Sequence, residues 1–159
     1  MGRTAVDSEL QRLDTALVRL RHLWDSPDIK RRFLELLGRP VELSLVRTLR
    51  AMEIAAGDPG VSAVAETLHV DASTASRFVD QAVARGWVSR NTSTQDRRRC
   101  VLALTDDGAE LLVEINTARA ELLAELTNGW PDADVTVLSA LLERLSQSLP
   151  VPATHPEPS

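Results

Sequence analysis

The 159-residue sequence predicts a mainly α-helical protein that carries one small β-ribbon. Three observations predict this class. Long stretches near both ends repeat leucine at helical spacing, two short helical patterns lie in the middle of the chain, and two strand-like runs follow them. Aromatic residues make up only 3% of the chain, so leucine, valine and alanine must build the core, and that composition favours helices.

The N-terminal part predicts three helices after a loose tail over residues 1–7. The first helix is expected over about 8–24, the second over about 28–37 and the third, a support helix, over about 41–56. One apolar stripe of the first helix has the spacing of a heptad seam: Leu10, Leu13, Leu17, Leu20 and Trp24. This seam fits an intersubunit contact and a helix packed on its own core about equally well.

The two short helices in the middle of the chain form a helix-turn-helix pattern. Ser62 can cap the first helix, and His69 lies in the turn, where histidine tolerates a positive φ. Asp71 is the expected N-cap of the second helix, and Gly86 follows its C-terminus. The residues expected to face inward are Val64, Ala65, Leu68, Ala75, Phe78, Val79, Ala82 and Val83.

The outward face of the second short helix is small, hydroxylated and basic, and it carries Ser73, Thr74, Ser76 and Arg77. Small hydrogen-bond donors near a helix N-terminus suit a helix whose first turns enter the DNA major groove. Many purely structural helix pairs share this pattern, so the pattern needs support from the residues that follow it.

That support comes from the two strand-like runs, Trp87–Val88 and Val101–Leu104, and from the polar segment between them. Arg97, Arg98 and Arg99 lie near the tip of the predicted ribbon, where they can reach phosphates or a narrow minor groove. A solvated hairpin loop explains three consecutive arginines poorly. The helix pair and the basic ribbon together predict a winged helix-turn-helix.

The spacing from the D-R-R segment at 96–98 to the L-T-x-x-G segment at 104–108 resembles the wing signature of the multiple-antibiotic-resistance regulator (MarR) family. The resemblance covers about residues 41–112, and the flanking helices match in pattern only. One departure is His69, where such turns usually carry glycine.

The resemblance implies a homodimeric transcription regulator that binds a pseudo-palindromic operator in double-stranded DNA. It also implies repression of nearby genes, relieved by a small aromatic or phenolic effector or by an oxidant. We expect Ser73, Thr74, Ser76 and Arg77 to contact the major groove. The wing residues expected to contact DNA are Asp96, Arg97, Arg98 and Arg99, with Arg98 in the minor groove and Asp96 orienting it.

The C-terminal part predicts a long helix over about 107–128 and a last helix over about 132–149. Their apolar positions are Leu111, Leu112, Ile115, Ala118, Leu122, Leu123, Leu126, Val135, Leu138, Leu141, Leu142, Leu145 and Leu149. These helices carry more apolar surface than so small a module can cover. The excess predicts a second copy joined by isologous contacts.

The whole chain, residues 1–159, is therefore interpreted as one MarR-type domain. Helices over about 8–37 and 107–149 form the dimerisation part, and about 41–106 form the winged helix-turn-helix. Residues 150–159 are expected to be a disordered tail.

The net charge of −5 is unevenly distributed along the chain. The segment Asp71–Thr105 holds six arginines and three aspartates, a net charge of +3, while the remainder carries −8. A basic face on an acidic body can still bind phosphate locally.

Residue patterns typical of enzymes and metal sites are missing from the sequence. His22, His69 and His155 lie far apart, so neither a metal nor a cofactor is expected. The lack of an N-terminal targeting pattern and of a 20-residue apolar run, together with a single cysteine, predicts a cytoplasmic protein without membrane contact.

Two other functions stay open at this stage. One is a winged-helix module that binds proteins and never DNA, although such a module does not need three wing arginines. The other is a redox switch through Cys100, which follows those arginines; a small hydrophobe in a wing strand is the favoured interpretation of this cysteine. Trp24, Arg47 and Trp87 are weak candidates for an effector cleft, and the effector-binding residues stay unknown.

Overall fold

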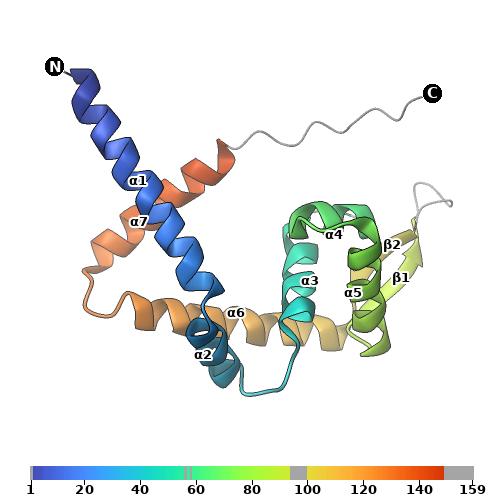
Figure 1. Ribbon diagram of the computed structural model, residues 1–159. Helices are drawn as coiled ribbons and strands as arrows, with labels where there is room; N and C mark the ends of the chain where they lie inside the picture. The colour runs from blue at the N-terminus through green and yellow to red at the C-terminus, as the bar shows by residue number, and fades with distance from the viewer. Residues whose placement is uncertain (1, 56, 58, 94–99, 149–159) are drawn as a thin grey trace, which may run out of the picture. The chain divides into compact units, whose positions relative to one another are not determined.

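The computed structural model describes residues 2–55, 57, 59–93 and 100–148. Within them the chain forms helices and one two-stranded sheet (Figure 1), and it divides into two compact units, residues 1–122 and 123–159. The elements are α1 (Gly2–Asp25), α2 (Pro27–Leu37), α3 (Leu43–Ile54), α4 (Val61–Leu68), α5 (Ala72–Ala84), β1 (Val88–Thr92), β2 (Cys100–Leu104), α6 (Asp106–Leu126) and α7 (Asp132–Gln147). This order confirms the predicted mainly α-helical class with a small β-ribbon.

The helix-turn-helix consists of α4 and α5, supported by α3. His69 adopts a left-handed conformation with φ 54°, as its place in the turn predicted. The turn is held by two backbone hydrogen bonds, from the His69 amide to the Glu66 carbonyl (3.2 Å) and from the Val70 amide to the Ala65 carbonyl (3.1 Å). These bonds satisfy carbonyls that the end of α4 would otherwise leave without partners.

The predicted cap of α4 is wrong by two residues. The extended residue Gly60 precedes the helix, and its carbonyl accepts the first helical hydrogen bond from the Val64 amide at 3.3 Å. Ser62 lies inside the first turn with its side chain exposed. The helix begins earlier because the segment before it is tied to the ribbon, where the Leu102 amide donates to the Pro59 carbonyl at 2.8 Å.

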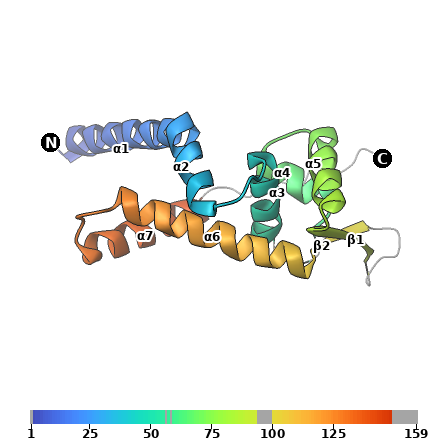
Figure 2. The same cartoon turned by 90° about the horizontal axis from the view of Figure 1, so that it is seen from below.

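The ribbon pairs β1 and β2 in antiparallel register, from Val88 opposite Leu104 to Thr92 opposite Cys100. Figure 2 shows α3, α4 and α5 gathered beside this ribbon, while α6 runs past α3. Val88 and Leu102 are buried, so the inner end of the ribbon belongs to the core and only the outer end projects.

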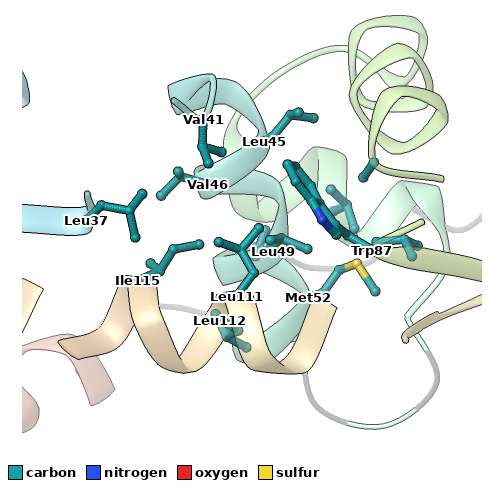
Figure 3. Close-up of a cluster of buried hydrophobic side chains, with 14 of the residues drawn as sticks. Leu37, Val41, Leu45, Val46, Leu49, Met52, Trp87, Leu111, Leu112 and Ile115 are labelled. Carbon is teal, nitrogen blue, oxygen red and sulfur yellow. The ribbon is translucent and has the colours of Figure 1, made fainter. Parts of the chain in front are cut away.

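The core of the first unit lies between α3 and α6 (Figure 3). Leu45 and Leu49 of α3 and Leu111 and Ile115 of α6 are almost completely buried. Every side chain predicted to face inward from α4 and α5 is buried or packed against this core. The apolar side of the long helix is buried as far as Leu122.

One backbone contact fixes how α6 leaves the ribbon. The Thr105 amide donates to the Trp87 carbonyl (3.1 Å), and the Thr105 hydroxyl donates to the Gly86 carbonyl (2.5 Å). The same hydroxyl oxygen accepts from the Gly108 amide at 3.1 Å. Thr105 thereby caps α6 and ties its first turn to the end of α5, which explains the T-x-x-G spacing physically.

Helix α1 begins at Gly2, so the prediction of a loose tail is wrong over residues 2–7, and residue 1 lies outside the described residues. No proline or other strong helix breaker separates residues 3–7 from the rest of the helix. The four leucines of its heptad seam are exposed, at 58% for Leu10, 46% for Leu13 and 39% for both Leu17 and Leu20. The core of the described chain therefore does not cover this seam.

The second unit holds the end of α6 and the last helix, α7. Leu123 and Leu126 at the end of α6 are exposed, in line with the prediction that these helices carry more apolar surface than the module covers. The large apolar side chains exposed on α7 are Val137, Leu138, Leu141, Leu142 and Leu145. Residues 150–159, predicted to be a disordered tail, lie outside the described residues.

None of the helices in the described ranges combines the length and the hydropathy that a membrane crossing requires.

Gly108→Ala is expected to destabilise the protein, although alanine is the better helix former by up to about 1 kcal/mol. A Cβ at this position would lie 1.9 Å from the Trp87 carbonyl oxygen, so backbone must move. We expect a loss of about 1–3 kcal/mol in the free energy of unfolding, measured by urea denaturation. Ala109→Gly, at the exposed neighbouring position, calibrates the propensity effect. A Gly108→Ala protein at least as stable as the wild type would contradict the close contact.

Candidate nucleic-acid interface

Helix α5 begins at a carboxylate that accepts several hydrogen bonds. Asp71 Oδ1 accepts from the Thr74 amide at 2.9 Å, and Asp71 Oδ2 accepts from the Thr74 hydroxyl at 2.7 Å. The Ser73 hydroxyl also donates to Asp71 Oδ1. The Ser73 hydroxyl, then the hydroxyl and amide of Thr74, hold the pKa of Asp71 well below its usual range. The predicted N-cap is confirmed, and its carboxylate is ionised at neutral pH.

This arrangement changes the role expected for the two hydroxyl groups. The sequence interpretation treated Ser73 and Thr74 as donors to DNA. In the structure both hydroxyl hydrogens already point to Asp71, because an ionised carboxylate can only accept. The expectation that these side chains are free donors is therefore wrong for the unbound protein.

Arg77 lies one turn beyond Ser73 on the exposed face of α5. Its guanidinium carbon lies 5.6 Å from the centre of the neighbouring Phe78 ring. In the described part of the chain, no carboxylate forms an ion pair with Arg77. Ser76, the other predicted contact, is partly buried beside it. The structure thus brings the four predicted residues of α5 together at its N-terminal half.

Two other arginines of the basic segment are engaged within the protein. Arg90 Nη2 of β1 lies 2.6 Å from Asp80 Oδ1 of α5, so this ion pair joins the ribbon to the helix. Arg85 Nη2 lies 3.6 Å from Glu42 Oε1, and its guanidinium carbon lies 5.6 Å from the centre of the Trp87 ring. Sequence reasoning missed both pairings, since neither separation follows a helical or strand period.

The predicted wing contacts Asp96, Arg97, Arg98 and Arg99 lie outside the described residues. Cys100, the first residue of β2, is a free and exposed cysteine. It lies in a wing strand, as the favoured interpretation expected, but its side chain is not buried there.

A cleft of about 490 Å³ lies between α1, α2, α3 and α6 in the first unit. Trp24 and Arg47, two of the three weak effector candidates, line it, whereas Trp87 is buried in the core. Sequence reasoning missed two further cations on its wall, Lys30 and Arg119. The cleft is lined by Trp24, Asp25, Ile29, Lys30, Phe33, Leu43, Ser44, Val46, Arg47, Arg119 and Leu122.

The cations of this cleft are held in different ways. The Arg119 guanidinium carbon lies 5.2 Å from the centre of the Trp24 ring, and burial, with the charge of Arg50, lowers the pKa of Arg119. Lys30 Nζ donates to the Asp25 carbonyl at 2.7 Å. Arg47 Nη2 donates to the Leu68 carbonyl at 3.3 Å, so a residue of the cleft wall also contacts the end of α4.

Metal ligands do not gather in the part of the chain that the structure describes: no group of three or more histidine, cysteine or acidic side chains is placed to hold an ion. His22 and His69 are exposed, and His155 lies outside the described residues.

Comparison with known proteins identifies the same module. The model of the MarR family matches residues 40–100, which hold the support helix, the helix-turn-helix and most of the ribbon. A protein assigned to the transcriptional regulation of the hcr operon in Thauera aromatica is 33% identical over 96 residues, which are 59% of this chain and 58% of that protein. The chain thus spans about six-tenths of the length of the curated relative.

Two solved structures share the fold over most of the chain. A MarR family protein from Bacillus stearothermophilus has a TM-score of 0.69 and 21% identity, over 89% of this chain and 95% of its own. A mutant MarR from E.coli has a TM-score of 0.63 and 26% identity, over 82% of this chain and 96% of its own. The curated relative is described as a transcriptional regulatory protein, and a regulator of transcription is also what the sequence led us to expect. The family model, the curated relative and the solved structures thus agree that the chain is similar to MarR family proteins, above all over residues 40–100.

Proposed function

We propose that the protein is a homodimeric, sequence-specific DNA-binding regulator of transcription whose helix α5 enters the major groove. The observation that carries the proposal is the exposed N-terminal half of α5, where Arg77 lies on the same side as the hydroxyl groups of Ser73 and Thr74. A helix that places small polar side chains and an arginine on its first turns fits the geometry of base recognition. The family match supports the same role for this helix.

The wing is proposed to add contacts to the backbone and the minor groove. Arg97, Arg98 and Arg99 supply the cations, with Arg98 in the minor groove and Asp96 holding its guanidinium. Among the described arginines of the basic segment, Arg85 and Arg90 are engaged by carboxylates. Among the described arginines of this segment, Arg77 therefore remains the cation without a carboxylate partner.

Arg77→Ala tests the proposed base contact. A good bidentate contact discriminates between bases by roughly 1–3 kcal/mol, so the variant should lose about that much affinity for a selected operator. Its affinity for random DNA should change much less. Fluorescence-anisotropy titrations of both duplexes at one salt concentration measure the two losses.

Arg85→Ala serves as the matched control, because Arg85 already pairs with Glu42. An equal loss on operator and random DNA would show that Arg77 contacts only phosphate. A wild-type chain without affinity for any duplex would favour the alternative, a winged-helix module that binds proteins.

The dimer is proposed to bury the two apolar faces that the described chain leaves exposed. These are the leucine seam of α1, defined above, and the apolar side of α7. Contiguous exposed leucines are rare on monomeric proteins and mark contact surfaces. A second copy presents the same faces, so isologous contacts can cover both. A two-fold dimer also matches a pseudo-palindromic operator.

The double variant Leu13→Glu, Leu20→Glu should shift the protein from dimer to monomer, because it places four charges in a two-fold seam. Light scattering after size-exclusion chromatography measures the mass. Gln11→Glu, an exposed polar position of the same helix, adds charge outside the seam and should leave the dimer intact. A double variant that stays fully dimeric would refute the proposed seam.

Release from DNA is proposed to follow binding of a small aromatic or phenolic anion in the cleft between α1, α2, α3 and α6. The apolar wall and the cations of the cleft suit a ring that carries a carboxylate or phenolate. Arg47 donates to the Leu68 carbonyl at the end of α4, so an anion that draws Arg47 away removes a bond to the helix-turn-helix. The hydrogen bond from Arg47 to Leu68 thus links the cleft to the helix-turn-helix, which supports a repressor that a ligand releases from DNA.

Calorimetric titration with 2-hydroxybenzoate tests this cleft. Arg47→Ala should weaken binding about tenfold or more, since a hydrogen bond to a charged group contributes roughly 1.5–3 kcal/mol. Arg31→Ala, which removes an exposed cation outside the cleft, is the control and should bind as the wild type does. Equal affinity of the Arg47→Ala and wild-type proteins would place the ligand elsewhere.

A further inference from the structure

The first turn of α5 presents hydrogen-bond acceptors to the solvent, because the hydroxyl hydrogens of Ser73 and Thr74 are both engaged by Asp71. A serine or threonine hydroxyl has one hydrogen and two lone pairs. Ser73 and Thr74 each give that hydrogen to Asp71, which has none to offer in return. Both hydroxyl oxygens are therefore left with lone pairs that can only accept.

Turning either hydroxyl around would cost the Asp71 carboxylate a hydrogen bond. That carboxylate is exposed, and in the proposed complex it lies near DNA phosphates. A carboxylate without its donors is least favourable beside other negative charges. The direction of the two hydroxyl groups is thus set within the protein before DNA arrives.

Acceptors select particular bases in the major groove. Cytosine offers the N4 amino group and adenine offers the N6 amino group, whereas guanine O6 and N7 and thymine O4 are acceptors. Two acceptors that face each other without a hydrogen between them repel. An acceptor surface therefore favours cytosine or adenine over guanine or thymine on the strand that it faces.

We propose that Ser73 and Thr74 read the exocyclic amino groups of cytosine or adenine, and that Asp71 imposes this preference by holding both hydroxyl hydrogens. The proposal rests on the proposed function, in which α5 lies in the major groove. Asp71 acts as a positioning residue, and the two hydroxyl groups determine the specificity.

Arg77 complements this surface with the opposite polarity. It offers only donors, which suit guanine O6 and N7. Side chains one helical turn apart have Cβ atoms about 5–6 Å apart, and base pairs rise by about 3.4 Å. The half-site should thus hold an amino-bearing base within about two base pairs of a guanine.

Selection from a randomised duplex library tests the proposal with the full chain. Ser73→Ala and Thr74→Val each remove a hydroxyl group, and the operator positions whose preference they abolish are the positions that these side chains read. Those positions should carry cytosine or adenine, preferred by roughly tenfold over guanine or thymine in the wild-type protein.

Asp71→Asn is the decisive variant. Asparagine is as good an N-cap as aspartate, so α5 keeps its start. Its amide nitrogen donates, however, which turns at least one hydroxyl hydrogen outward. The preference at the same positions should then shift toward guanine or thymine. Asp80→Asn neutralises another carboxylate of α5 that touches neither hydroxyl, and it should leave the preference unchanged.

The outcomes separate the inference from the proposed function. A wild-type chain that enriches no sequence would overturn DNA recognition itself. Enrichment of guanine or thymine at the positions read by Ser73 and Thr74 would overturn the inference alone. So would hydroxyl variants that alter no position, or an Asp71→Asn protein with the wild-type preference.

Discussion

The contact between the Trp87 carbonyl and Gly108 is the constraint on which the winged helix-turn-helix depends. A Cβ at residue 108 would lie 1.9 Å from that oxygen, so only glycine lets α6 pass so close to the end of α5. Thr105 uses the space by bonding Gly86, Trp87 and Gly108 at once. The ribbon, α5 and α6 are thereby tied to one another by backbone contacts and by the Thr105 side chain, and the apolar side chains fill the interior.

Because these contacts hold α5 in place, the directions in which the Ser73 and Thr74 hydroxyl groups donate are set within the protein itself. In the proposed complex, Asp71 adds a negative charge near the DNA phosphates, which weakens binding to every sequence about equally. In exchange it caps the helix and fixes two hydroxyl groups in one direction. Specificity is the difference between the affinities for two sequences. Asp71 would therefore lower the affinity for all DNA while it increases the discrimination between sequences.

The conformational preferences of single residues made much of the fold of the first unit predictable from the sequence. The Asp71 cap, the left-handed His69 and the break at Gly86 follow from the preferences of single residues, and the helix periods identified the core faces. Pairings across the fold could not be predicted that way. The bonds of Arg90 to Asp80 and of Arg47 to Leu68, and the directions of the two hydroxyl groups, depend on which partners the tertiary structure supplies.

The same tertiary pairings connect parts of the first unit that the sequence keeps separate. Trp24 at the end of α1 forms one wall of the cleft and lies under the Arg119 guanidinium of α6. Arg47, which also lines the cleft, reaches the end of α4. The exposed leucine seam belongs to the same helix as Trp24, so in the proposed dimer a partner that holds α1 would also hold one wall of the cleft. In the proposed response, a ligand of the cleft would act on the helix-turn-helix from that wall, so both proposals depend on the position of α1.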